Sequence, residues 1–418
     1  MYNNFVSKVN LQSRANVTIQ KATHQETKKH NRDLVLKTIF EAETISRAQI
    51  ARTTRLTRPT VSDVVSGLLA EDLVEEVGIG SSIGGKSPIL LSLVKDSRYM
   101  ISLNLAYDQF CGAVVNLRGE VKAMESIPVA GQDGQQALGK VYEILDRLTN
   151  LDWKPLVGIG VGTPGLINTR EGMIVNAVNL DWQNLPLAQL LQDRFHLPTH
   201  IMNDSQAAAI GEYVYGGGYA SDENLVVINV RQGIGAGILI NGRLFQGDGG
   251  GAGEIGHVVV QENGLQCRCG KRGCLETLAS TRAVVQRAQI LAPEVAPSAL
   301  AGDPAAITFD SLVDAFASND ALAKQVVLDA AHYLGVSIAG LVSTLNIKRF
   351  VLTGDMTRFG QAWLDAVRAA TAQATLSKLA EETSIDIGKV DYRGCILGAS
   401  ALTLLDGYSL LFLHSPSD

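Results

Sequence analysis

The sequence contains no run of apolar residues that approaches the roughly 20 needed to cross a membrane. Its opening stretch lacks the long apolar core of a secretory signal. Tandem repeats and low-complexity tracts are also missing, and hydrophobic residues make up 46% of the 418 positions. That apolar content is too high for an extensively disordered chain. These features predict a folded cytoplasmic protein.

Cysteine is scarce, with five in the whole chain, yet three of the five fall within eight residues. In a cytoplasmic protein such a cluster favours a metal site over a disulfide. His257 precedes Cys267, Cys269 and Cys274, and three thiolates with one imidazole complete a closed tetrahedral zinc site. The alternative is a set of buried cysteines packed as small hydrophobic residues. We expect a structural Zn²⁺.

Length and charge divide the chain into unlike parts. A chain of 418 residues is too long for one ordinary domain. Residues 1–95 carry a formal charge of +4, and the remainder carries −10. A basic N-terminal part joined to an acidic remainder predicts that only the N-terminal part binds a polyanion. A solvated basic tail would give the same distribution of charge.

Strand and helix patterns alternate after residue 95. Extended apolar segments are followed by helical segments, of which the longest are expected at 320–345 and 360–382. Strands alternating with helices imply an α/β architecture with covered sheets. The apolar segment that follows Gly398 is expected to form a helix that docks on the body.

The front of the chain shows three short helical patterns. The first is expected over Asn31–Ala42, and residues 1–29 are expected to form a flexible basic arm. Ser46 and Thr57 are predicted N-caps of the second and third helices, because their hydroxyls can accept free backbone N–H groups. Arg55 occupies a turn position that usually takes glycine for its left-handed backbone.

This pattern predicts a winged helix-turn-helix that binds DNA. Arg58, Thr60 and Ser62 fall on the outer face at the start of the third helix, the end that enters the major groove in such proteins. A Gly-rich segment holding Lys86 is expected to be the tip of a wing. Arg55 would add a phosphate contact, or its turn is built differently. A helical module that docks another protein is the alternative.

Several longer motifs carry a family resemblance. The segments GEIGHVVV, CRCGKRGCLE, GIGVGTPGLI and INVRQGIGAGILINGRLFQG together resemble the ROK family of repressors and sugar kinases. The front of the chain resembles the DNA-binding end of the family's repressor branch, in particular its xylose-repressor-like members. The resemblance implies a two-lobed, actin-like ATPase fold of the sugar-kinase type behind the winged helix-turn-helix. The domain boundaries expected from it are 30–95 for the DNA-binding domain, 96–202 with part of 385–418 for the first lobe, and 203–384 for the second.

The resemblance also implies a sugar site in the cleft. The family's contacts fall on six polar residues: Asn179, Asn203, Asp204, Glu254, His257 and Glu276. Carboxylates and amides suit this task because they hydrogen-bond hydroxyls and reject ligands that lack them. His257 appears twice because one ring nitrogen can bind zinc while the other faces the sugar.

The phosphate side of the same cleft departs from the family's kinases. Asp204 matches their general base and is retained. Their first phosphate hairpin, Asp-x-Gly-Gly-Thr, is replaced by the segment from Asn104 to Asp108, and Arg231-Gln232 stands where Gly-Thr is usual. Glycines let the backbone approach phosphate, so their loss predicts that nothing is phosphorylated and that Asp204 is a vestigial base.

The expected function is a sugar-responsive repressor of carbohydrate-utilisation genes. Its expected partners are an operator in double-stranded DNA and a monosaccharide or short oligosaccharide, and the protein is expected to be a homodimer or homotetramer. An active sugar kinase with an attached DNA-binding domain is the alternative. Regulation by a membrane-transporter protein, which the resemblance allows, also stays open.

Overall fold

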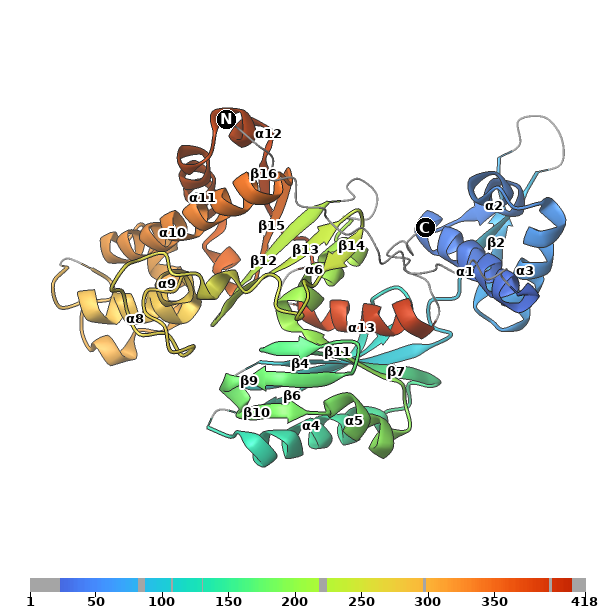
Figure 1. Cartoon of the computed structure of the whole chain (residues 1–418), viewed down its shortest axis with the longest axis horizontal. Helices are drawn as coiled ribbons and strands as arrows, with labels where there is room; N and C mark the ends of the chain where they lie inside the picture. The colour runs from blue at the N-terminus through green and yellow to red at the C-terminus, as the bar shows by residue number, and fades with distance from the viewer. Residues whose placement is uncertain are drawn as a thin grey trace, which may run out of the picture. The chain divides into compact units, whose positions relative to one another are not determined.

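The computed structural model describes residues 23–81, 87–106, 108–129, 131–217, 224–295, 298–390 and 393–407. The chain divides into two compact units, Met1–Leu93 and Val94–Asp418. Each unit has its own hydrophobic interior (Figure 1).

The first unit is a winged helix. Three helices pack against a small antiparallel sheet whose strand order is β1-β3-β2. Val35, Ile39, Ile50 and Val65 are completely buried between them. The elements are α1 (His24–Ala42), β1 (Ile45–Ser46), α2 (Arg47–Thr54), α3 (Arg58–Ala70), β2 (Val74–Ile79) and β3 (Ile89–Leu93).

The helix starts in this unit follow from side-chain caps. Ser46 accepts the backbone N–H of Gln49 in a reciprocal capping box, and Thr57 accepts that of Thr60, so both predicted N-caps are confirmed. The first helix begins earlier than expected, because Thr23 forms a capping box with Glu26. Residues 24–29 are therefore helical, and the expectation of a flexible arm for them is wrong.

The first lobe of the second unit is built on a five-stranded mixed sheet of order β11-β7-β4-β5-β6. Helix α4 packs on β5 and β6, and α5 on β11, while α13 crosses β7 and β4 (Figure 1). A small sheet, β8 to β10, lies beside this lobe's core. The elements are β4 (Tyr99–Leu105), β5 (Gln109–Asn116), β6 (Val121–Pro128), α4 (Gly134–Thr149), β7 (Leu156–Thr163), β8 (Leu166–Asn168), β9 (Met173–Ala177), the 3-10 helix η1 (Val178–Leu180), β10 (Trp182–Leu185), α5 (Leu187–Phe195), β11 (Thr199–Asn203) and α13 (Gly394–Gly407).

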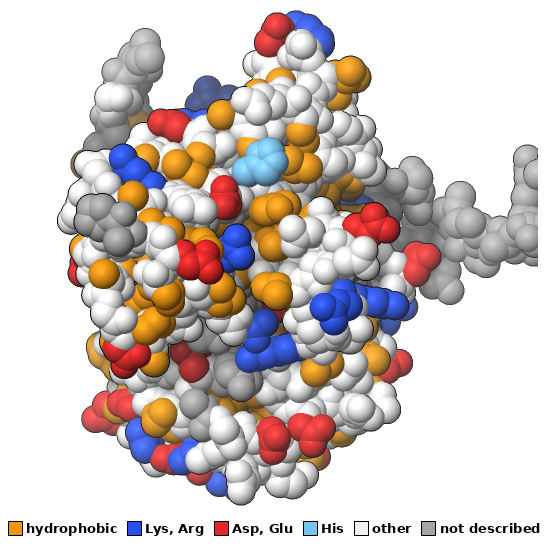
Figure 2. Space-filling model, turned by 90° about the vertical axis from the view of Figure 1, so that its left-hand side faces the viewer, with side chains coloured by type: hydrophobic (Ala, Val, Ile, Leu, Met, Phe, Trp, Pro, Cys, Tyr) orange, Lys and Arg blue, Asp and Glu red, His pale blue; other side chains and the backbone are white. Residues whose placement is uncertain are grey.

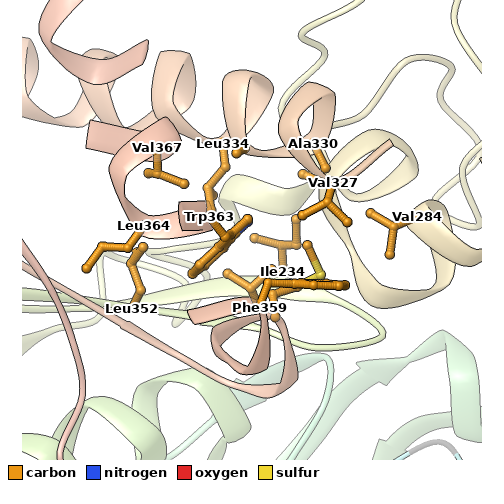
Figure 3. Packing of buried hydrophobic residues seen from close by; sticks show 14 of the residues in the cluster. Ile234, Val284, Val327, Ala330, Leu334, Leu352, Phe359, Trp363, Leu364 and Val367 are labelled. Atoms are coloured by element: carbon orange, nitrogen blue, oxygen red, sulfur yellow. The ribbon is translucent and has the colours of Figure 1, made fainter. Parts of the chain in front are cut away.

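The second lobe is built on another five-stranded sheet, of order β14-β13-β12-β15-β16. Its helices bury Trp363, Phe359 and Leu334 against Ile234 and Leu352 of the sheet (Figure 3). The helical segment expected at 360–382 is two helices. The elements are α6 (Asp204–Tyr215), β12 (Leu225–Val230), β13 (Ile234–Ile240), β14 (Arg243–Phe245), η3 (Ile255–His257), α7 (Glu276–Ala279), α8 (Thr281–Leu291), α9 (Phe309–Ala317), α10 (Ala321–Leu345), β15 (Arg349–Thr353), η5 (Asp355–Phe359), α11 (Gly360–Ala374), α12 (Ser377–Glu382) and β16 (Ser384–Ile387).

Helices α6 and α13 cross between the two lobes at very close range. A Cβ added at Gly398 would lie 1.6 Å from the carbonyl oxygen of Ala207, and one at Gly211 would lie 2.3 Å from that of Gly394. Only glycine allows the two backbones to approach in this way. The expected docking of the chain's last apolar helix takes this form.

Helix α10 is long and apolar enough to span a membrane by length and composition. Half of its most apolar window is buried in the second lobe, as in a core helix of a folded domain. Its exposed side carries Asp329 and His332 between Leu328 and Val336. The face of the molecule in Figure 2 shows hydrophobic side chains interspersed with charged and polar ones. A single such helix is weak evidence for a membrane.

Candidate functional site

The start of α3 presents two of the predicted DNA contacts to solvent. Arg58, its first residue, and Ser62, one turn later, are both exposed. Thr60 is half-buried, and its hydroxyl lies 2.9 Å from that of Thr57. Thr60 therefore contributes to the helix cap, and its hydroxyl is partly occupied before any DNA binds. The predicted contact Lys86 lies outside the described residues.

Two arginines at the α2–α3 turn, Arg55 and Arg58, differ from Arg32 and Arg47 of the same unit. Arg32 is paired with Glu71 at 2.6 Å, and Arg47 with Glu76 at 2.9 Å. Arg55 and Arg58 are exposed, and within the described part of the first unit neither has an ion-pair partner. Arg55 adopts the left-handed conformation, with φ at 57°, so it takes the usual turn geometry without glycine. Unpaired guanidinium groups beside a helix N-terminus suit phosphate oxygens and guanine edges.

In the second unit the predicted metal ligands converge. The ligand atoms of His257, Cys267, Cys269 and Cys274 all lie within 4.8 Å of one another. The Sγ atoms of Cys269 and Cys274 are 3.6 Å apart. Two thiolates on one tetrahedral Zn²⁺, each bound at about 2.3 Å, would lie about 3.8 Å apart. The four side chains therefore fit a metal ion of this size.

The two ring nitrogens of His257 face different partners. Nδ1 lies 3.6 Å from Sγ of Cys267, on the side of the cysteines. Nε2 lies 3.9 Å from a carboxylate oxygen of Glu254. The imidazole thus stands between the cysteine cluster and the carboxylates of the cleft, as its two predicted tasks require.

Asn203 and Asp204 sit at the junction of β11 and α6. The side-chain oxygen of Asn203 caps α6 by accepting the N–H groups of Ser205 and Gln206. Its amide nitrogen donates to the carbonyl of Gly165 at 3.0 Å and to Glu254 at 3.3 Å. Asp204 accepts the N–H of Ser205 at 2.7 Å. Burial raises the pKa of Asp204, and the Ser205 hydrogen bond opposes that rise.

Glu254 lies near two other carboxyl groups of the predicted sugar site, those of Asp204 and Glu276. Burial, followed by the nearby charges of Asp204 and Glu276, raises its pKa to about 7. Glu276 accepts the N–H of Ile234 at 3.3 Å and lies 4.0 Å from Arg282. Three carboxyl groups in one partly buried place suit a ligand that offers several hydroxyl donors.

The loop that carries Glu254 is held by Gln206, a residue that the sequence did not single out. Gln206, in the first turn of α6, donates its amide to the carbonyls of Gly250 and Ala252 at 3.0 and 3.2 Å. Its sequence signal was its place two residues after Asp204. Gln206 therefore fixes the loop relative to the helix that bears the predicted base.

Asn179 lies apart from the other predicted sugar residues. It is half-buried in η1, at the edge of the first lobe. Its side-chain oxygen accepts a hydrogen bond of 3.1 Å from Arg268, which stands between two of the clustered cysteines. No contact of Asn179 with the cleft carboxylates occurs among the described residues.

Arg231, which the sequence predicts to face the phosphate side of the site, forms an ion pair. The guanidinium of Arg231, directly after β12, donates through Nε to Asp355 at 3.3 Å. Arg231 also acts electrostatically on Asp204, whose pKa its charge lowers. Asn104, in the replaced first hairpin, is buried within β4, and Tyr107 lies outside the described residues. The position expected to be small in this loop thus carries a charged side chain that forms an ion pair.

Comparison with known proteins places this geometry in a family. The model of the ROK family matches residues 100–405. A protein named "Xylose repressor" from Caldicellulosiruptor bescii is 32% identical over 390 residues, which cover 92% of this chain and 97% of that protein. The likeness to this relative therefore includes the winged helix.

Two solved structures match this chain over different shares of its length. A ROK family transcriptional regulator described as a homolog of the Escherichia coli MLC protein matches with a TM-score of 0.80 and 25% identity, over 93% of this chain and 98% of that one. A ROK family glucokinase from Streptomyces griseus, solved with glucose and AMPPNP, matches with a TM-score of 0.67 and 25% identity. It covers 73% of this chain and 98% of its own. The predicted fold, a winged helix-turn-helix before a two-lobed sugar-kinase-like domain, is confirmed.

Proposed function

Since the chain belongs to the ROK family, we propose that it is a sugar-responsive transcriptional repressor. The first unit binds an operator in double-stranded DNA. The cleft of the second binds a monosaccharide or short oligosaccharide and does not phosphorylate it. The protein acts in the cytoplasm on genes of carbohydrate use. One observation carries the proposal: a winged helix with unpaired arginines and a group of three neighbouring carboxyl groups occur in one chain.

Sugar recognition rests on Asp204, Glu254, Glu276 and the amide of Asn203. Asn203 and Glu254 belong to different lobes and share a hydrogen bond of 3.3 Å. A sugar that bonds to both would favour one arrangement of the lobes. It changes DNA affinity only by its differential binding to the two arrangements.

The cluster of His257, Cys267, Cys269 and Cys274 holds Zn²⁺ in this proposal. The ion is structural, because four protein ligands leave no open position. It would tie together the loop after η3 and the start of α7. Glu254 directly precedes η3, whose last residue is the proposed ligand His257, and Glu276 is the first residue of α7, which supports a link between the metal and the sugar site.

The absence of phosphorylation is supported by the phosphate side of the cleft. Positioning and neutralising the nucleotide phosphates is most of what a kinase does. Here the side chains of Arg231 and Asp355 form an ion pair with each other in that region. Asp204 then accepts a hydroxyl hydrogen bond without passing a proton onward.

DNA binding is tested by selecting bound sequences from a random duplex library with the full-length protein. A homodimer or homotetramer predicts two half-sites about one helical turn apart, or a multiple of that spacing. Arg58→Ala is expected to weaken the selected site by roughly 1–3 kcal/mol and random DNA by much less. The exposed Arg52 offers a control in the neighbouring helix. If Arg58→Ala weakens binding to selected and random DNA equally, Arg58 does not take part in base recognition. If the library yields no enriched sequence, the proposed repressor function is contradicted.

The sugar response is tested by titrating the selected duplex complex with D-xylose, D-glucose and N-acetyl-D-glucosamine. We expect one of them to change the apparent affinity for DNA, and Glu276→Gln to reduce that change. Sugar-dependent ADP release would identify the protein as a kinase. If none of the sugars changes the affinity for DNA, the effector is expected to be a protein.

A further inference from the structure

The solvent side of helix α10 carries very little charge. Six exposed residues at helical spacing form one stripe along it, which we call the α10 stripe: Gln325, Leu328, Asp329, His332, Val336 and Gly340. Only Asp329 among them carries a formal charge at pH 7, although residues 96–418 as a whole carry −10. A helix that meets only water normally has charged residues on its outer face. The α10 stripe is therefore suited to contact with another protein surface.

Apolar exposure in this region is not confined to the stripe. Leu328 and Val336 are each 39% exposed. Gln261 donates to the hydroxyl of Tyr333 at 3.4 Å, so the segment just before Gln261 lies beside α10. In that segment Val258 is 55% exposed. Exposed apolar residues that lie together mark an interaction surface, whereas isolated ones are ordinary.

The middle of the α10 stripe is held in place before any partner binds. The rings of His332 and Tyr333 lie edge to face, with their centroids 5.8 Å apart. Tyr333 is half-buried, and its hydroxyl is fixed by Gln261. Side chains that are already ordered lose less conformational entropy on association. This part of α10 is thus preorganised for contact.

The charges of the α10 stripe are self-complementary. Asp329 is exposed and forms no ion pair within the described residues of the second unit, and His332 follows three positions later. Two α10 helices packed antiparallel around a twofold axis between residues 330 and 331 would set Asp329 against His332 of the partner subunit, and the reverse. A carboxylate accepts a hydrogen bond from an imidazole N–H whether or not the ring is charged. The same register sets Leu328 against Tyr333 of the partner subunit.

Neighbouring registers fit less well. An axis at His332 would set the two His332 rings against each other and Asp329 against the buried Gly335 of the partner subunit. An axis at Asp329 would oppose two carboxylates, which is unfavourable. The charge pattern therefore selects the register with its axis between residues 330 and 331.

We infer that the α10 stripe is the contact surface between two copies of this chain, whose α10 helices pack antiparallel around a twofold axis. From Gln325 to Gly340 the stripe rises about 22 Å along the helix. A standard interface covers about 800 Å² on each partner, a patch roughly 30 Å across, so the stripe and the adjoining segment are of the right extent. The inference goes beyond the proposed function, because it needs neither DNA nor sugar.

The first test is sedimentation equilibrium of the full-length protein without DNA or sugar. The wild type should have twice the 44.6 kDa mass of one chain, or four times if dimers pair further. Leu328→Asp and Val336→Asp should each raise the dissociation constant of the dimer at least about 10-fold, because a carboxylate would be buried without a partner. Both residues are exposed in the single chain, so the fold should survive, which circular dichroism checks.

Leu376→Asp is the matched control. Leu376 directly precedes α12 in the same lobe, outside the α10 stripe, and is 73% exposed. The variant adds the same charge at an exposed leucine. Its dissociation constant should equal that of the wild type.

An exchange of charges tests the register. His332→Asp alone should weaken the dimer roughly 10-fold or more, because it sets carboxylates against each other. Adding Asp329→His restores both pairs in reversed order, so the double variant should return to within about threefold of the wild type. A double variant that recovers nothing would overturn the inference.

A wild type that stays monomeric at micromolar concentration would also overturn the inference, and the α10 stripe would then be assigned to another protein or another part of this chain. So would a dimer that Leu328→Asp and Val336→Asp both leave intact. In each of these cases, sequence-selective DNA binding that responds to a sugar would leave the proposed function standing.

Discussion

In the proposed function, the site in the second unit has a sugar end and a phosphate end, and the two ends differ in their charged groups. At the sugar end Asp204, Glu254 and Glu276 gather, and the pKa of Glu254 rises to about 7. At the phosphate end Arg231 and Asp355 form an ion pair, where a kinase needs space and backbone N–H groups. In this proposal, the fold keeps the recognition half of an enzyme site while its reactive half is replaced. If the two ends are independent, a substitution at one end should leave the other end unchanged.

The largest effect is expected from removing a proposed metal ligand at the sugar end. Cys269→Ser should lose the ion and with it the sugar response, because the loops that carry Glu254 and Glu276 would separate. The first unit should stay folded, since it has its own core. Elemental analysis and circular dichroism measure the two outcomes.

Cys111→Ser is the control for that experiment, because Cys111 lies on β5 outside the cluster. It should keep both metal and response. Well-folded wild-type protein with less than one zinc per chain would contradict the structural role of the ion.

The next largest effect is expected from Asp204→Asn. A charged acceptor bonded to a buried hydroxyl contributes roughly 1.5–3 kcal/mol, so sugar affinity should fall by one to two orders of magnitude. The fold should survive, because an asparagine oxygen can still accept the N–H of Ser205. Sugar-free DNA binding should not change. If Asp204→Asn does not change the sugar concentration needed to alter DNA binding, Asp204 is not part of the sugar site.

The smallest effect is expected at the other end. Arg231→Ala removes an ion pair whose side chains are each about one-third exposed. Such pairs contribute roughly 0–1 kcal/mol, so sugar affinity should change less than about fivefold. The variant should not gain ATP hydrolysis, because the first phosphate hairpin stays replaced. A large loss of sugar affinity would show that the two ends are coupled through Asp204.

The fold followed from the family resemblance, whereas the details that residue patterns alone predicted correctly are local ones. Ser46 and Thr57 cap the helices that follow them, because a hydroxyl and an N–H three residues later meet in any helix start. The cysteine cluster was also readable from spacing alone. The early start of α1 could have been read from Thr23 and Glu26, but a polar stretch without apolar periodicity hid it.

The features that sequence missed join distant parts of the chain. Arg268 meets Asn179 across 89 residues, and Arg231 meets Asp355 across 124. Neither pair has a local pattern, because each forms only when separate segments of the second unit fold together. Asn203 shows the same limit: its double task as helix cap and partner of Glu254 appears only with the fold.

The central claim is that this protein senses a sugar without phosphorylating it. The most direct measurement titrates the operator complex with sugar and ATP·Mg²⁺ while ADP release is followed in the same sample. The account predicts a sugar-dependent change in DNA affinity with no ADP formed, and an inducing concentration raised by Asp204→Asn. Sugar-dependent ADP release that disappears in Asp204→Asn would show a working kinase and contradict the account.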